Sequence, residues 1–188
     1  MNVISTGVDC NRFSLKHHQT NQLKEITLLY VGRLISRKNV DKIIYAFEKL
    51  CNKYKLKLII VGDGPDKERL EKISDHVEFT GVIPDTENMY KQADIFISPS
   101  EYGEGLQGSI LEAMSCGLTV VATNTQINAE LLAEGRGFTV DTSVESIADG
   151  IKKAIISDRQ EIAKKSRKYM LEHYDWRKKA KEILEVLK

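Results

Sequence analysis

The sequence has few of the features that define membrane, secreted or disulfide-stabilised proteins. No apolar run approaches the roughly 20 residues that a helix needs to cross a bilayer. The first residues lack the charged and hydrophobic regions of a signal peptide. The three cysteines are widely spaced without a CxxC pair, which supports neither a disulfide framework nor a zinc site. We therefore expect a cytoplasmic protein whose cysteines serve as small buried hydrophobic side chains.

Several ligand-binding signatures are also missing. The chain has no GxGxxG, since the position three residues after Gly64 is Lys67, and it has no GxxxxGK[ST]. No Asp-x-Asp pair is present to hold a metal on a diphosphate, and the four histidines form no cluster. The sequence thus gives no support to Rossmann-type NAD binding or to P-loop hydrolysis, and it predicts no metal site.

Charge is balanced over the whole chain but not along it. The net charge of +1 does not suggest a nucleic-acid binder. Residues 151–188 contain 12 Lys or Arg and 6 Asp or Glu, a net +6, which leaves 16 basic and 21 acidic residues, a net −5, in residues 1–150. Solvated faces of terminal helices are the simpler explanation of the basic segment, and attraction to an anionic membrane surface is the alternative.

What is present points to one α/β domain. At 188 residues with 41% hydrophobic content, the chain can build a substantial core. Short runs rich in Ile, Val and Leu alternate with longer segments of helical spacing, which is typical of βαβ units. We expect strands at 26–31, 56–61, 77–80, 95–98, 119–122 and near 138–140, and Pro65 as a first helical residue. Because the strands are continuously apolar, helices should cover both faces of a doubly wound, parallel, Rossmann-like sheet.

The glycine-containing segments follow the predicted strands. In open parallel sheets, ligands bind beyond the carboxyl ends of the strands, where such segments should converge on one cleft. Arg33 and Lys38 come after the first strand, where they are either surface cations or a clamp for a diphosphate. Their position beside Gly32 favours the clamp.

The stretch from Glu104 to Gly117 carries two carboxylates around the glycine-rich start of a helix. The first turn of such a helix offers free N–H groups to a phosphate. A glycosidase pair would hold its carboxyl groups about 5–9.5 Å apart, whereas eight helical residues span about 12 Å. Glu104 and Glu112 are thus better placed to grip a sugar and a ribose on either side of a diphosphate. For Glu112 a solvent-facing position is the alternative, and Glu130 fits a ligand contact or a helix surface equally well.

Together these motifs resemble the retaining glycosyltransferases of family 4, also called group 1, and specifically the C-terminal donor-binding domain of their GT-B fold. The match runs nearly end to end. The matching segments are Val3–Asp9 with Arg12 and Phe13, Tyr30–Arg33 with Lys38, Val61–Pro65, Phe79–Gly81, Ala93–Ser100 and Glu104–Gly117.

The resemblance assigns roles to residues of the whole 1–188 domain. It implies that Arg33 and Lys38 stabilise the leaving diphosphate and that Glu104 holds the transferred sugar, so these three are the expected catalytic residues. Glu112 is expected to bind the ribose. The further expected donor contacts are Gly32 and Gly62, then Val82 and Ile83 near the base, and Gln107, Gly108, Ser109 and Ile110 near the phosphates.

The resemblance also implies a metal-independent reaction without a cofactor, and retention of the anomeric configuration by internal return. A second, N-terminal domain would supply the acceptor site and a catalytic histidine. Residues 1–25 would then be a post-linker segment, and a terminal helix over 174–188 would pack toward that domain with its apolar face exposed here. We expect this chain alone to be monomeric and inactive.

The expected substrates are a UDP- or GDP-hexose, such as mannose, glucose or galactose, and a lipid-linked or surface-glycan acceptor. The Lys-, Ile- and Asn-rich composition suggests a low-GC bacterium, where this family often builds envelope polysaccharide, for example lipopolysaccharide or exopolysaccharide, at the inner face of the cytoplasmic membrane. The chain departs from the family at Gln107, where Gly or Pro is usual, and at Asn124–Glu130, which lacks two glycines. A hydrolysing nucleotide-sugar epimerase and a non-catalytic nucleotide-sugar binding module are the alternative functions.

Overall fold

A computed structural model describes residues 6–15, 25–101 and 103–186. Within them a single parallel sheet has the strand order β3-β2-β1-β4-β5-β6. The strands are β1 (Ile26–Val31), β2 (Leu56–Val61), β3 (Val77–Gly81), β4 (Ile95–Ser98), β5 (Thr119–Thr123) and β6 (Gly137–Val140). The predicted strands and the doubly wound fold are therefore confirmed, with β3 and β5 each extending one residue further than expected.

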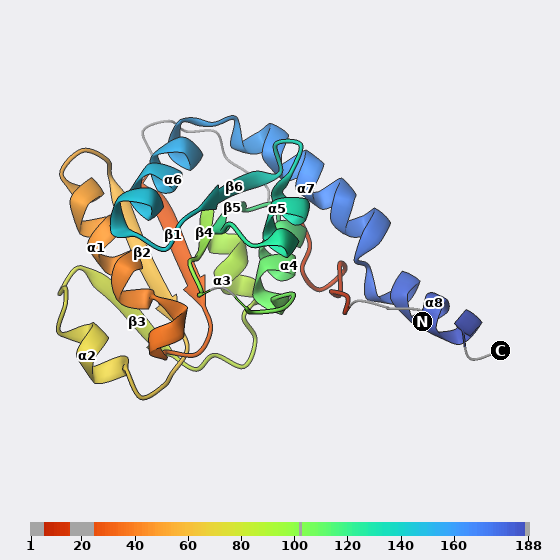
Figure 1. Ribbon diagram of the computed structural model, residues 1–188, viewed down its shortest axis with the longest axis horizontal. Helices are drawn as coiled ribbons and strands as arrows, with labels where there is room; N and C mark the ends of the chain where they lie inside the picture. The colour runs from red at the N-terminus through yellow and green to blue at the C-terminus, as the bar shows by residue number, and fades with distance from the viewer. Residues whose placement is uncertain (1–5, 16–24, 102, 187–188) are drawn as a thin grey trace.

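Helices connect the strands and cover the sheet on both sides (Figure 1). They are a 3₁₀ turn η1 (Ser36–Lys38), α1 (Val40–Cys51), α2 (Lys67–Glu71), α3 (Glu87–Gln92), α4 (Gly108–Ser115), α5 (Gln126–Leu132), α6 (Val144–Ile156), α7 (Arg159–His173) and α8 (Trp176–Val186). Helices α1 and α6 lie on one face, and α3, α4, α5 and α7 lie on the other.

Two hydrophobic cores lie on opposite faces of the sheet, and successive residues of the central strands pack alternately into one and the other. On β1, Leu29 packs into the core beneath α3 and α4, whereas Leu28 and Tyr30 pack into the core beneath α1 and α6. Successive strand residues point to opposite faces, and both faces are covered. This explains why the strand sequences are continuously apolar.

The expectation for Pro65 is wrong. Helix α2 begins at Lys67, and Pro65 lies in the preceding turn. The backbone there bonds to the loop after β1 instead of starting a helix: the N–H of Asp66 donates to Leu34 O at 3.1 Å, and the N–H of Leu34 donates to Asp63 O at 2.9 Å. A side chain at Gly64 would collide with the Leu34 backbone, its Cβ lying 2.3 Å from Leu34 O.

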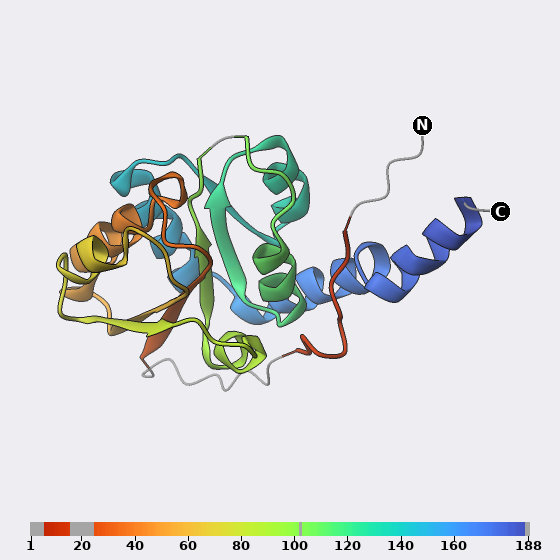
Figure 2. The ribbon, with the colours of Figure 1, turned by 90° about the horizontal axis from the view of Figure 1, so that it is seen from below.

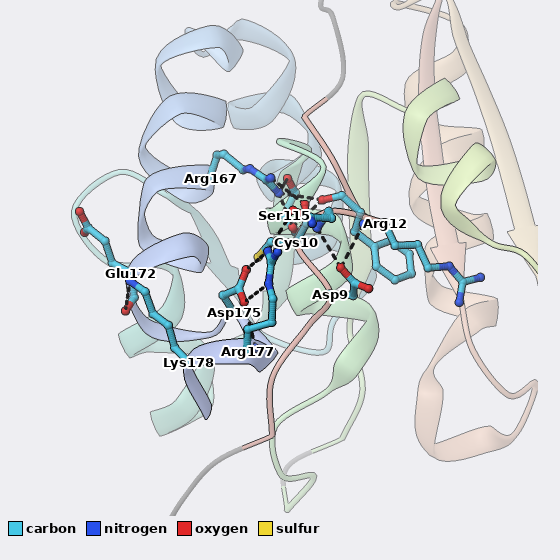
Figure 3. Close-up of polar contacts among 11 residues, drawn as sticks. Asp9, Cys10, Arg12, Ser115, Arg167, Glu172, Asp175, Arg177 and Lys178 are labelled. Carbon is cyan, nitrogen blue, oxygen red and sulfur yellow. Dashed lines mark hydrogen bonds and ion pairs between the residues drawn. The ribbon is translucent and has the colours of Figure 1, made fainter. Parts of the chain in front are cut away.

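The described part of the leading segment, residues 6–15, is irregular and lies against the end of α7 and the C-terminal end of α4. Val8 exchanges backbone hydrogen bonds with Tyr174 and Trp176, at 2.8 and 3.0 Å. Arg167 of α7 donates to the carbonyls of Cys10 at 2.7 Å, Phe13 at 2.8 Å and Ser115 at 3.0 Å (Figure 3). One arginine thus joins three segments. Residues 3–5 of the matched Val3–Asp9 motif lie outside the described residues.

Helix α8 projects away from the body of the domain in both views (Figures 1 and 2). None of its described residues is buried. Its apolar side chains are half exposed, with Trp176 at 50%, Ile183 at 44% and Leu184 at 60%. The expected exposure of this apolar face is confirmed, and its packing on a further domain stays a prediction. Across the described residues, no helix combines the length and apolar character needed to span a membrane.

Candidate functional site

The loops after β1, β2, β3 and β4 meet at the carboxyl edge of the sheet. Backbone hydrogen bonds link them directly, from Gly62 N to Gly81 O at 2.8 Å and from Glu101 N to Arg37 O at 2.8 Å. Gly62 has a φ of +135°, and a Cβ on it would lie 1.9 Å from Gly32 O. Only glycine permits this approach. Gly62 therefore brings the first two loops together, whatever it contacts in a ligand.

A partly buried ion pair lies where the strand order reverses between β1 and β4. The Nζ of Lys38 donates to Oε2 of Glu104 at 2.5 Å, and Nε of Arg37 lies 3.4 Å from Oε1 of the same carboxylate. The side chains of Lys38 and Glu104 are only 18% and 13% exposed. Ligands bind at such a reversal in open α/β sheets. The structure thus brings two of the expected catalytic residues into contact.

The backbone around Lys38 explains how it reaches the pair. It ends the short turn η1, and the following Asn39 adopts a left-handed conformation with a φ of 52°. The buried side chain of Asn39 donates to the carbonyl of Pro99 at 2.8 Å, which fixes this loop against the loop after β4. Arg37 was not identified from the sequence, although it lies in the same basic run.

Arg33, the third expected catalytic residue, is exposed and lies outside this pair. Its carbonyl accepts a hydrogen bond from the Tyr30 hydroxyl at 2.9 Å. Burial, and then the nearby charge of Glu104, raise the pKa of Tyr30, so the hydroxyl stays a donor. Within the described part of the chain, no acidic side chain pairs with the Arg33 guanidinium, which remains open to a ligand.

Helix α4 presents its N-terminus to the same edge. Gln107 is its N-cap, but no side-chain cap bond forms there, and the amide oxygen of Gln107 accepts from Ser98 Oγ at 2.8 Å. The N–H of Ile110 donates to Gln107 O at 3.1 Å, and its side chain is buried. The first-turn N–H groups of Gly108 and Ser109 therefore remain as the expected phosphate donors.

Glu112 is one turn further along α4, and it is partly buried rather than solvent-facing. The Tyr90 hydroxyl, on α3, donates to Oε2 of Glu112 at 2.7 Å. Burial raises the pKa of the Glu112 carboxyl, while the hydrogen bond from Tyr90 and the charge of Arg12 oppose that shift. The two carboxylates thus have separate partners within the protein, and their expected contacts with different parts of a ligand stay a prediction. Tyr90 was not identified from the sequence.

The expected base-binding residues lie between β3 and α3. Val82 is 72% exposed, whereas Ile83 is partly buried against the core beneath α3 and α4. Asp85 of the same connection and Glu87, the first residue of α3, form ion pairs with Arg12 of the leading segment at 2.7 and 2.8 Å.

A separate groove of about 660 Å³ lies between α5 and α7, and Glu130 lines it. Its charges are mixed, since Lys165 and Lys168 face Glu134 and Glu172. Its buried Arg136 donates to the carbonyls of Leu131 and Glu130 at 2.8 Å each. The mixed charges of this groove indicate no particular class of ligand. Glu130 lies among the α5 and α7 side chains that line it. No cluster of His, Cys, Asp and Glu suited to a metal ion occurs among the described residues.

Comparisons with known proteins point in one direction. The family described as glycosyl transferases group 1 matches residues 12–186. An uncharacterized glycosyltransferase of Methanocaldococcus jannaschii is 35% identical over 176 residues, covering 86% of this chain and 45% of that protein. One subunit of the human phosphatidylinositol N-acetylglucosaminyltransferase is 34% identical over 167 residues, covering 82% of this chain and 33% of that protein.

A solved structure matches the fold over most of its own length. The C-terminal domain of a group 1 family glycosyl transferase (LpcC) from Francisella tularensis has a TM-score of 0.77 at 24% identity, with 89% of this chain and 98% of that chain covered. The present chain therefore spans less than half of its two sequence relatives but corresponds to nearly all of that domain.

Proposed function

The chain belongs to the group 1 glycosyltransferases, with the fold of their C-terminal GT-B half, and on this premise we propose that it binds the sugar nucleotide for a retaining hexosyltransferase. The donor is a UDP- or GDP-hexose. The remaining part of a longer enzyme supplies the acceptor site.

The observation that carries the proposal is the contact between Lys38 and Glu104 at the reversal of strand order, beside the N-terminus of α4. A cation, a carboxylate and uncapped N–H groups are the groups that a diphosphate linked to a sugar requires. A cation near a departing diphosphate stabilises the charge that develops as the glycosidic bond breaks.

In the proposed complex Arg33, Lys38 and the first turn of α4 bind the diphosphate. Glu104 accepts hydrogen bonds from the sugar, and Glu112 accepts them from the ribose while Tyr90 orients its carboxylate. Val82 and Ile83 line the base. These cations and backbone groups would neutralise the diphosphate without a metal ion.

For the acceptor we propose a lipid-linked or surface glycan, such as that of lipopolysaccharide or exopolysaccharide, used at the inner face of the cytoplasmic membrane. The human relative at 34% identity is named for a phosphatidylinositol substrate, which favours a lipid-linked acceptor. A hydrolysing epimerase would release a free sugar epimer instead of a glycosylated product, so product analysis separates the two.

Calorimetry of this chain with UDP, GDP and their hexose conjugates tests the proposal. Removing one charge-assisted contact costs about 1.5–3 kcal/mol, or roughly tenfold or more in affinity. Arg33→Ala is therefore expected to weaken the nucleoside diphosphate by at least about tenfold. Lys55→Ala is the control, because Lys55 is an exposed cation that precedes β2 at the opposite edge of the sheet.

Glu104→Ala tests the binding of the sugar separately from the binding of the diphosphate. It should weaken the sugar conjugate by about tenfold. Affinity for the bare diphosphate should be retained or increased, because Lys38 loses its carboxylate partner. Failure of every nucleoside diphosphate to bind at millimolar concentration would sink the proposal, and equal losses of both ligands with Glu104→Ala would remove the sugar role.

A further inference from the structure

Arg12 joins the leading segment to the connection between β3 and α3. Its Nε donates to Glu87 Oε2 at 2.9 Å, and its Nη2 donates to Asp85 Oδ1 at 2.7 Å. Figure 3 shows the guanidinium pointing away from the neighbouring cluster of Cys10, Asp175 and Arg177. Its planar fork holds two carboxylates in one geometry, which a lysine cannot do. Asp85 lies two residues after the proposed base-binding residue Ile83, and Glu87 is the first residue of α3.

The next residue, Phe13, contacts Tyr90, and Tyr90 contacts Glu112, which is the proposed ribose-binding residue. The rings of Phe13 and Tyr90 meet edge to face, with centroids 5.7 Å apart and planes at 83°. Tyr90 in turn donates to Glu112 at 2.7 Å. The Arg12 guanidinium lies over the Phe13 ring, 5.4 Å from its centroid.

The sugar and diphosphate side of the proposed pocket has different supports. Lys38 and Glu104 are held by each other, by Arg37 and by the hydrogen bond from Asn39 to Pro99. None of the described contacts of Arg12 reaches that group. The pocket therefore divides into two halves with separate scaffolds.

We propose that Arg12 is a positioning residue for the nucleoside half of the donor pocket: it holds the base-lining loop in place and, with Phe13, keeps Tyr90 aimed at Glu112. This inference rests on the proposed function. Arg12 acts by pre-organisation, since a loop already held in its bound conformation loses less entropy when the ligand binds.

Arg12 also suits a test, because its side chain is 43% exposed. Exposed ion pairs contribute little to global stability. Its loss should therefore affect the loop and leave the folded domain intact. Lys49→Ala is a matched control, since it breaks an equally exposed ion pair with Glu145 between α1 and α6, with a distance of 2.5 Å.

The experiment is calorimetry of UDP, GDP and inorganic pyrophosphate with the unaltered chain, Arg12→Ala, Arg12→Lys and Lys49→Ala. Arg12→Ala should weaken both nucleoside diphosphates several-fold and by no more than about tenfold, because the two ion pairs of this exposed arginine hold the loop only weakly. Pyrophosphate affinity should be unchanged. Arg12→Lys should restore part of the loss, because it keeps the charge without the fork, and Lys49→Ala should match the unaltered chain.

The outcomes distinguish the two proposals. If the unaltered chain binds nucleoside diphosphates and Arg12→Ala binds them equally well, the positioning role is wrong and the proposed function stands. Equal losses for pyrophosphate and nucleoside diphosphates would mean general loosening, which also overturns the positioning role. If the unaltered chain binds no nucleoside diphosphate, the proposed function fails and this inference fails with it.

Discussion

The surroundings of Glu112 have opposing effects on the pKa of its carboxyl. Burial makes its charged form unfavourable and raises the pKa of its carboxyl. The hydrogen bond from Tyr90 at 2.7 Å and the charge of Arg12 oppose that shift, because both favour the ionised form. A carboxylate kept in such a position costs stability at neutral pH, which is common where a charged group serves a ligand rather than the fold.

Glu112→Gln should therefore stabilise the ligand-free chain at pH 7. In the folded state the raised pKa makes the carboxyl bind its proton more tightly than in the unfolded chain, so its contribution to stability falls as pH rises through both pKa values. Glutamine removes that cost and still accepts from Tyr90. Thermal unfolding should show a rise of about 2–4 °C for each kcal/mol regained.

The pH dependence provides the check on this prediction. The difference between Glu112→Gln and the unaltered chain should shrink as pH falls toward and below the ordinary glutamate pKa of 4.5, because the carboxyl then takes up a proton in both the folded and the unfolded chain. Glu172→Gln, on the exposed face of α7, serves as the control and should show little change. A gain in stability that is constant with pH would contradict the explanation by burial.

Helices α7 and α8 follow each other in the chain but contribute differently to the fold. Helix α7 buries Ile162, Ala163, Ser166 and Met170 against the sheet and α4. Helix α8 has no buried described residue and projects from the domain (Figure 1). Burial of apolar surface is the main stabilising contribution to folding, so α7 belongs to the core while α8 does not.

Deleting residues 181–188 should therefore change the free energy of unfolding by less than about 1 kcal/mol, because the described residues of this segment, 181–186, are exposed. Met170→Ala should cost about 2–5 kcal/mol, because it opens a cavity at a fully buried side chain. Urea denaturation measures both values. A deletion as costly as Met170→Ala would mean that α8 supports this domain itself.

At the scale of the whole molecule, this chain spans less than half of its two sequence relatives, and its terminal helix exposes Trp176, Ile183 and Leu184. We expect these 188 residues to bind a nucleotide sugar without transferring the hexose, because they match less than half of the two sequence relatives. We also expect the proposed acceptor half to cover the apolar face of α8.

Limited trypsin digestion tests the second expectation. In this chain the exposed cations Arg177, Lys178 and Lys181 should be cut early, whereas a longer chain that includes the other half should be protected there. The sites at Lys53 and Lys55, on the far side of the sheet, provide the reference for equal digestion. Equal cutting of α8 in both chains would show that the helix stays free. Hexose transfer by this chain alone would show that no second half is needed.

Much of the fold and part of the site follow from local sequence patterns. Continuous apolar runs located all six strands, and glycines after the strands located the edge where the loops meet. The spacing of Glu104 and Glu112 favoured contacts with different parts of a ligand over a shared catalytic bond, and that stays a prediction. Each of these features depends on neighbouring residues in the chain, so periodicity and turn chemistry suffice to predict it.

Which polar side chains contact each other at the candidate site depends on the tertiary structure. Lys38 meets Glu104 across 66 positions, Tyr90 meets Glu112 across 22, and Arg12 meets Glu87 across 75. No local pattern encodes such pairs, because packing of the helices and loops on the sheet decides which polar side chains meet. The sequence alone determined the sheet and the carboxyl edge at which loops converge, while the packing decided that Arg12 pairs with Asp85 and Glu87 and that the Tyr90 hydroxyl donates to Glu112.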